Sequence, residues 1–316
     1  MRILFAGTPE IALLSLETLS REGLVAAVLT SPDASRGRGR SLSPSPVKAL
    51  ALDLNLPVFT PGRLGREARE EIAEIGADLL AVVAYGKIFG PRFLELFPSG
   101  AINLHPSLLP RHRGPAPLPF TILEGDGEWG LSVQRIALEM DAGDILLQKS
   151  FPLKGTETTG VLGALAAEEG SAAMLEVVRE IEAGIEKPVP QRHQDATYSR
   201  LLTKEDGMID WNQSAEKIGR MVRAFNPWPG AYTGFQDQKL TIWEAAVLRE
   251  NSSLGAGNVA AVDRKRGILI QTGEGLLAVQ SLQLQGKKRL PWQSFVNGVR
   301  GIEGSILGGT NEKLHG

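Results

Sequence analysis

The sequence predicts an α/β fold, with a doubly wound, mostly parallel sheet followed by a small C-terminal β-barrel. Three short runs, 3–6, 24–29 and 78–84, are apolar at nearly every position, and stretches with helical spacing separate them. Strands of a parallel sheet are covered on both faces, so they read as continuous apolar runs instead of alternating ones. With 316 residues, the chain is long enough for this domain and a second one.

Each element of the first domain has its own signal. The strand at 3–6 is closed by Gly7-Thr8-Pro9, and proline is favoured in the first turn of a helix. No GxGxxG motif follows this strand, so a standard dinucleotide site is not expected. Further strands are expected at 101–104, 131–136 and 145–151, and a long helix rich in Ala, Leu and Glu at 159–183.

The second domain is predicted from a change of pattern. The polar segment 189–206 is expected to link a domain of residues 1–188 to one of residues 207–316. After a short helix at 215–224 the pattern contains strands only, which are rich in branched residues and separated by glycine. These strands are expected at 240–243, 258–262, 267–271 and 275–284.

Composition limits the classes of function. The chain has no cysteine, which excludes disulfides and thiolate metal sites. It shows neither a signal peptide nor a run of about 20 apolar residues, so a cytoplasmic protein without a membrane span is expected, by default a monomer. From Gly207 onward there are 13 basic and 9 acidic residues, a net charge of +4, against 21 and 27 before it, a net charge of −6. This asymmetry fits a polyanionic partner or ordinary surface charge.

The stretch 101–110 contains the first candidate catalytic groups. Asn103 and His105 are two positions apart on an expected strand, so they point to the same face at its carboxyl end, where open α/β sheets bind ligands. Asn offers an amide donor, and His exchanges a proton near neutral pH. Acyl transfer to an amine needs both: a donor for the developing oxyanion, which is worth ~3 kcal/mol, and a group that moves the proton.

An acidic turn, 139–145, offers the carboxylate that would orient the histidine. Either Asp141 or Asp144 could supply it. Each feature taken alone is more often structural: an Asn-x-His at a strand end, or a solvated acidic hairpin. Their presence together with the Ser-Leu-Leu-Pro loop at 107–110 favours a catalytic site.

These motifs resemble those of the folate-dependent formyltransferases, and within them those of the methionyl-tRNA formyltransferase family. The similarity covers essentially the whole chain. It implies the formyltransferase fold for the first domain and a barrel of the oligonucleotide-binding type for the second. The motifs are Phe5-Ala6-Gly7-Thr8-Pro9-Glu10, Val82-Val83-Ala84-Tyr85-Gly86, Asn103-x-His105, Ser107-Leu108-Leu109-Pro110, Arg113-Gly114, Met140-Asp141-Ala142-Gly143-Asp144 and Phe225-Asn226-Pro227-Trp228-Pro229.

The resemblance implies that 10-formyltetrahydrofolate donates the formyl group to the α-amine of methionine on initiator methionyl-tRNA, without a metal. It implies that Asn103 holds the formyl oxygen, that His105 assists proton transfer, and that Asp141 keeps His105 charged or correctly turned. His112 departs from the family pattern and is expected only to line the entrance. The implied folate-binding residues are Ser107, Leu108, Leu109, Pro110, Val83, Tyr85, Gly86 and Asp144.

Two basic regions are the expected tRNA contacts. The first is the loop of Arg36, Arg38 and Arg40, which the resemblance assigns to the end of the acceptor stem and which is expected to be disordered without tRNA. The second consists of Lys265, Lys287 and Lys288 in the barrel. On charge alone the arginine loop would be a solvated loop, and the resemblance favours the tRNA contact; the barrel lysines could equally lie in solvated turns.

Two rival functions remain open at this point. A related formyltransferase that acts on a small amine would share Asn103, His105 and Asp141 without needing the arginine loop. An RNA-binding protein that has lost activity would not need these three residues at all.

Overall fold

The computed structural model describes residues 1–36 and 41–308, which form two compact units. The N-terminal unit contains residues 1–117, 128–152 and 162–200, and the C-terminal unit contains residues 118–127, 153–161 and those from 201 onward. The segment that the sequence favours as a linker, 189–206, is therefore divided. Its residues up to Arg200 belong to the N-terminal unit instead of forming a free connection.

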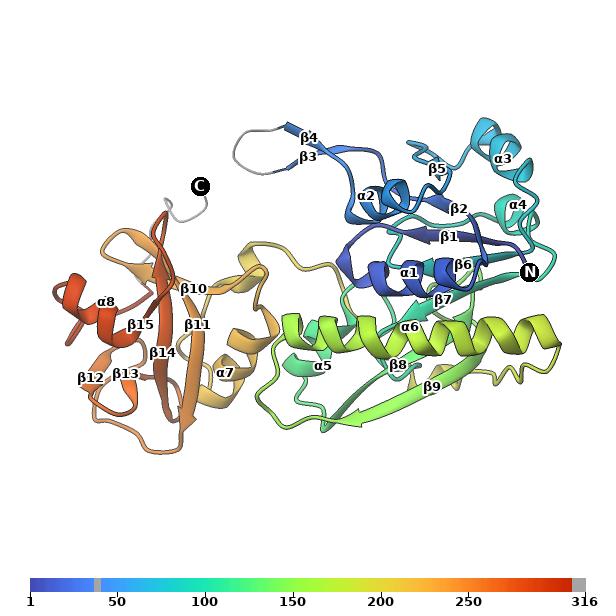
Figure 1. Ribbon diagram of the computed structural model, residues 1–316. Helices are drawn as coiled ribbons and strands as arrows, with labels where there is room; N and C mark the ends of the chain where they lie inside the picture. The colour runs from blue at the N-terminus through green and yellow to red at the C-terminus, as the bar shows by residue number, and fades with distance from the viewer. Residues whose placement is uncertain (37–40, 309–316) are drawn as a thin grey trace. The chain divides into compact units, whose positions relative to one another are not determined.

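The N-terminal unit is built on a seven-stranded sheet of order β5-β2-β1-β6-β7-β8-β9 (Figure 1). All pairings from β5 to β7 are parallel, whereas β8 and β9 run antiparallel to their neighbours. The sheet is thus mostly parallel, as predicted. Its strands are β1 (Ile3–Gly7), β2 (Val25–Leu29), β5 (Val58–Phe59), β6 (Leu79–Val83), β7 (Ala101–His105), β8 (Glu128–Arg135) and β9 (Ile145–Pro152).

Helices cover both faces of this sheet. Along β1, Ile3 and Phe5 enter the core that α1, α2 and α6 close, while Leu4 and Ala6 enter the core on the side of α3 and α4. Because successive side chains of a strand alternate between faces, a buried strand needs an apolar residue at every position. The helices of this unit are η1 (Glu10–Ala12), α1 (Leu13–Arg21), α2 (Pro46–Asp53), α3 (Arg66–Ala73), α4 (Pro91–Leu94), α6 (Thr159–Ala183) and η2 (His193–Asp195), and the hairpin β3 (Ala34–Arg36) and β4 (Ser41–Ser43) lies between β2 and α2 in the chain. Helix α5 (Pro117–Leu123) belongs almost wholly to the C-terminal unit.

Two glycines of α6 test how closely this helix packs on β7. A Cβ at Gly170 would lie 2.5 Å from the side chain of Leu104, whereas a Cβ at Gly163 would meet nothing within 4 Å. Gly163→Ala is expected to stabilise the protein by about 0.5–1 kcal/mol through helix propensity. Gly170→Ala is expected to destabilise it by about 1–3 kcal/mol because the core is overpacked. Urea unfolding of both variants measures the two changes in the free energy of unfolding. A stabilising Gly170→Ala would contradict the close contact between α6 and Leu104.

The C-terminal unit contains an antiparallel sheet of order β10-β11-β14-β13-β12, with β15 paired to β14. The segment 305–308 closes the gap between its edges, since Val259 N donates to Ser305 O at 2.9 Å and Gly308 N donates to Gly234 O at 3.1 Å. The predicted antiparallel architecture is confirmed. The elements are η3 (Glu205–Gly207), α7 (Ala215–Ala224), β10 (Ala231–Phe235), β11 (Gln238–Leu248), β12 (Val259–Asp263), β13 (Gly267–Gln271), β14 (Leu276–Leu284), β15 (Leu290–Pro291) and α8 (Trp292–Gly298).

Within residues 1–36 and 41–308, no helix combines the length and the apolar character that crossing a membrane would require.

Candidate functional site

The carboxyl end of β7 presents the two side chains that the sequence singles out. Asn103 pairs in register with Gln134 of β8, and His105 pairs with Ser132. His105 is 5% exposed, whereas Asn103 is only partly buried. The strand period thus places an amide and an imidazole on one face, next to the turn that joins β8 to β9.

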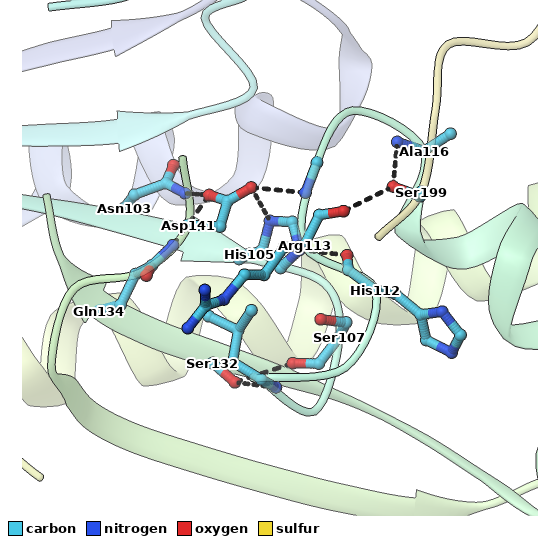
Figure 2. A network of polar contacts seen from close by, with 12 residues as sticks. Asn103, His105, Ser107, His112, Arg113, Ala116, Ser132, Gln134, Asp141 and Ser199 are labelled. Atoms are coloured by element: carbon cyan, nitrogen blue, oxygen red, sulfur yellow. Dashed lines mark hydrogen bonds and ion pairs between the residues drawn. The ribbon is translucent and has the colours of Figure 1, made fainter. Parts of the chain in front are cut away.

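Asp141 lies in this turn, and its carboxylate is the centre of the polar network in Figure 2. Oδ2 lies 3.6 Å from His105 Nδ1, and Oδ1 accepts a long hydrogen bond of 3.5 Å from Asn103 Nδ2. Gln134 Nε2 donates to Oδ1 at 2.9 Å, and the Gly114 amide donates to Oδ2 at 2.8 Å. The carboxylate therefore contacts the two candidate side chains and two further donors that orient it.

The residue pattern alone left Asp141 and Asp144 as alternatives, and the family resemblance assigned Asp141; in the structure it is the Asp141 carboxylate that lies against His105. Asp144 contributes its main-chain carbonyl to β8, where Arg135 N donates to it at 2.8 Å, while the carboxylate of Asp141 faces His105. The turn requires Gly143, because a Cβ there would lie 1.9 Å from Arg135 O. Asp141 itself has a positive φ of 52°, which is uncommon for a residue with a side chain and is maintained by its surroundings.

The second ring nitrogen of His105 faces the main chain of the following loop. His105 Nε2 lies 3.0 Å from His112 O, which can only accept, so Nε2 carries a hydrogen and Nδ1 faces the carboxylate. His112 is 4% exposed, with a φ of 54°, and its amide donates to Thr197 Oγ1 at 2.9 Å. The expectation that His112 lines an entrance is wrong for its side chain, which is buried. Its carbonyl holds the His105 ring.

The loop 107–110, which is expected to line a folate pocket, is held in place by buried side chains and by hydrogen bonds to β8. Ser107 is 1% exposed and its hydroxyl donates to Arg111 O at 2.7 Å, and Leu109 is 3% exposed. Ser132 Oγ donates to Ser107 O and accepts from Leu109 N, which ties the loop to β8. Leu108 and Pro110 are partly exposed, so these two side chains of the loop are open to a ligand.

The turn after β6 presents main chain instead of side chains. Val83 and Tyr85 are buried, and burial raises the pKa of the Tyr85 phenol to about 12. The Tyr85 ring stacks on Phe89 with the ring centroids 5.3 Å apart, away from the turn surface. Gly86 is exposed with a φ of 84°, and nothing lies within 4 Å of where its Cβ would be. Ligand contacts here would therefore be made by the backbone.

The predicted tRNA contacts lie in two separate regions. Arg36 ends β3, where it pairs with Ser41 of β4, and Arg38 and Arg40 lie outside the described residues. Lys265 is exposed in the β12–β13 turn, and Lys287 and Lys288 are exposed in the β14–β15 turn.

Sequence reasoning missed the residues that support the carboxylate. Gln134, Gln191 and the Gly114 amide were not expected, because hydrogen bonds between distant segments leave no local periodic signal. The expected strand at 131–136 contains Gln134, but its residue pattern does not give the register with Asn103. Among the residues that the structure describes, no group of three or more His, Asp or Glu is arranged to hold a metal ion.

Comparison with known proteins gives matches over both units. Residues 1–178 match the family described as formyl transferase, and residues 201–300 match the family described as formyl transferase, C-terminal domain. The methionyl-tRNA formyltransferase of Treponema denticola is 43% identical over 311 residues, which cover 94% of this chain and 97% of the relative. That of Symbiobacterium thermophilum is 44% identical over 302 residues, which cover 94% and 92%.

A solved structure supports the fold independently. WlaRD, a sugar 3N-formyl transferase crystallised with dTDP and 5-N-formyl-THF, matches with a TM-score of 0.65 at 18% identity. The match covers 91% of this chain and 99% of that one. At this level of identity the likeness shows the fold alone.

Proposed function

Because the chain belongs to the methionyl-tRNA formyltransferase family, we propose that it transfers the formyl group of 10-formyltetrahydrofolate to the α-amine of methionine on initiator methionyl-tRNA. The observation that carries the proposal is the position of the Asp141 carboxylate, which faces both Asn103 and His105. An amide donor, an imidazole and a carboxylate are the groups that acyl transfer to an amine requires. We expect the enzyme in the cytoplasm because both proposed substrates occur there.

In the proposed reaction each side chain has one task. Asn103 Nδ2 donates to the formyl oxygen, where negative charge develops as the amine attacks the formyl carbon, and such a donor is worth about 3 kcal/mol. The pair of His105 and Asp141 takes up the proton that the attacking amine loses. The same pair returns a proton to N10 of the folate as the bond from N10 to the formyl carbon breaks. Protons and charge are then balanced.

The folate site is proposed beside these groups, at the carboxyl ends of β6 and β7. These strands are neighbours in the sheet, and this edge is where open α/β sheets bind ligands. The exposed backbone around Gly86 offers main-chain donors and acceptors for a pterin ring. Leu108, Pro110 and the turn of Asp141 to Asp144 are proposed as the other walls.

A tRNA site on the C-terminal unit is supported by two turns at the same end of its sheet. β13 begins at Gly267 close to Val279, and β14 continues from there to Leu284, so the β12–β13 and β14–β15 turns lie at one end. Two arginines of these turns are engaged: Arg266 pairs with Asp263 and Glu250, and Arg289 pairs with Glu244. The exposed lysines, together with the exposed Arg264, are the groups proposed for phosphate contacts.

Replacing Lys265, Lys287 and Lys288 together with alanine is expected to raise the Kd for tRNA about 10-fold or more. The slope of log Kd against the logarithm of the salt concentration is expected to fall by about two to three, since about one unit of slope is lost with each phosphate contact. Binding titrations between low and high salt measure both effects. Lys217→Ala is the control, since α7 begins beside Glu274, near the opposite end of β14. Equal salt slopes for the triple variant and the wild-type protein would contradict the proposed contacts.

The function is tested by offering three acceptors separately with 10-formyltetrahydrofolate: methionyl-initiator tRNA, methionyl-elongator tRNA and a small amine such as an amino-sugar nucleotide. The structural likeness to a sugar formyltransferase makes the small amine the relevant rival. Formylation of the initiator alone supports the proposal. Formylation of only the small amine would refute the tRNA assignment, and formylation of none would refute the activity.

A further inference from the structure

The segment after α6, residues 189–200, runs beside the candidate site. Val189 exchanges two main-chain hydrogen bonds with β9, each 2.9 Å long. Further along, Arg113 N donates to Thr197 O at 2.9 Å, and Ser199 N donates to Arg113 O at 2.7 Å. The segment therefore adds an extended stretch of chain to the loop that follows β7.

Gln191, in this segment, is 6% exposed, and both ends of its amide are bonded. Its Nε2 lies 2.9 Å from Asp141 O and 2.7 Å from Gly143 O, the two carbonyls of the turn that presents the Asp141 carboxylate. Nε2 also lies 3.3 Å from Gln134 Oε1, and Gln134 is itself a donor to that carboxylate. Gln191 thus contacts the main chain of the turn, and it also contacts Gln134, which supports the Asp141 carboxylate.

The other end of the Gln191 amide holds Arg113, whose side chain is wholly buried. Oε1 accepts from Arg113 Nε at 3.1 Å and from Nη2 at 2.8 Å. The Glu139 carboxylate lies 3.5 Å from Nη1 and is largely exposed, so it screens the buried charge less than the Gln191 oxygen does. The amide next to Arg113 in the chain, that of Gly114, donates to Asp141. Gln191 therefore connects two segments: the turn that contains Asp141, and the Arg113–Gly114 segment, whose amide donates to the Asp141 carboxylate.

We propose that Gln191 is a positioning residue for the formyl-transfer site, which holds the Asp141 turn and the Arg113–Gly114 backbone in the arrangement where the carboxylate faces Asn103 and His105. The proposal rests on the proposed function. Asp141 has an unfavourable positive φ, so its conformation depends on such external contacts. A displacement of about 1 Å at a catalytic group costs up to about 100-fold in rate.

The test substitution is Gln191→Glu, which keeps the size of the side chain and an oxygen acceptor for Arg113. It replaces the Nε2 donor with an oxygen that repels the carbonyls of Asp141 and Gly143. We expect a Tm close to that of the wild-type protein, because pairing of the carboxylate with Arg113 offsets the repulsion at the two carbonyls. We expect kcat to fall about 10- to 100-fold while KM for either substrate stays within about twofold.

A readout without turnover separates this proposal from the proposed function. The ¹⁵N resonances of the His105 ring report the hydrogen bonding of Nδ1, and in Gln191→Glu they are expected to shift toward their positions in Asp141→Asn. If none of the acceptors is formylated, the proposed function fails, and these resonances still decide whether Gln191 positions Asp141.

Tyr198→Phe is the matched control, because it removes another partner of Arg113, the hydroxyl 3.3 Å from Nη1, without touching the Asp141 turn. It is expected to leave kcat and the His105 resonances unchanged. Should Gln191→Glu not fold, Gln191→Asn, which is one methylene shorter, is expected to show the same changes in kcat and in the resonances. Wild-type kcat with unmoved resonances would overturn the proposal. So would a loss of kcat that only follows Tm and recurs in Tyr198→Phe.

Discussion

Replacing Asp141 with asparagine is expected to lower kcat for formyl transfer about 10³- to 10⁴-fold, with KM for both substrates nearly unchanged. Asparagine fills the same space but offers His105 Nδ1 no anion and carries donors where the Gly114 and Gln134 amides already donate. A similar exchange of Asp for Asn beside a catalytic histidine costs about 10⁴-fold in a well-studied triad. Steady-state kinetics with methionyl-initiator tRNA measure the effect.

Asp144→Asn is the matched control for this experiment. It changes a carboxylate three positions along the same turn, and the carboxylate that lies against His105 and Asn103 is that of Asp141. Its kcat is expected to stay within about threefold of wild type, and any effect should appear in KM for the folate, beside which Asp144 is proposed to lie. The opposite result, a slow Asp144→Asn with an active Asp141→Asn, would show that the catalytic carboxylate has been misassigned.

Replacing Asn103 with alanine is expected to lower kcat about 10²- to 10³-fold, because it removes the one proposed donor to the formyl oxygen. The long 3.5 Å bond to Asp141 suggests that Nδ2 is not strongly committed within the protein and can turn toward a ligand. Kinetics give the loss, and a tRNA-binding titration should show an unchanged Kd.

The double variant of Asn103 and Asp141 sharpens this test. Both residues are proposed to act on one transition state. The loss of kcat in the double variant should therefore be smaller than the product of the losses in the two single variants. An Asn103→Ala protein with wild-type kcat would rule out the donor role, even if Asp141 proves essential.

Elements with long or strongly apolar patterns could be predicted from sequence. The helices at 159–183 and 215–224 and the strand at 267–271 have the expected bounds in the structure. The elements that were not predicted are short or have mixed patterns, such as β5 with two residues and α4 with four. Such short elements are stabilised by packing against neighbouring segments, and they are too short for an apolar periodicity to be recognised. The local sequence therefore carries little signal for them.

Residue patterns alone predicted the mostly parallel sheet, the antiparallel second unit and the common face of Asn103 and His105. Each of these follows from apolar runs or from the two-residue period of a strand. The similarity of its motifs also determined the family.

The family motif assigns the carboxylate of Asp141 to His105, but the contacts that hold it there are visible only in the folded domain. Asp141 reaches His105 because β8 and β9 turn back beside β7 and because Gly143 lets the turn pass close to Arg135. Gln191, which supports that turn, lies 50 positions further along the chain, in a segment whose polar composition favours a linker. Contacts between such distant positions arise from packing of the whole domain, and no local pattern of residue types encodes them.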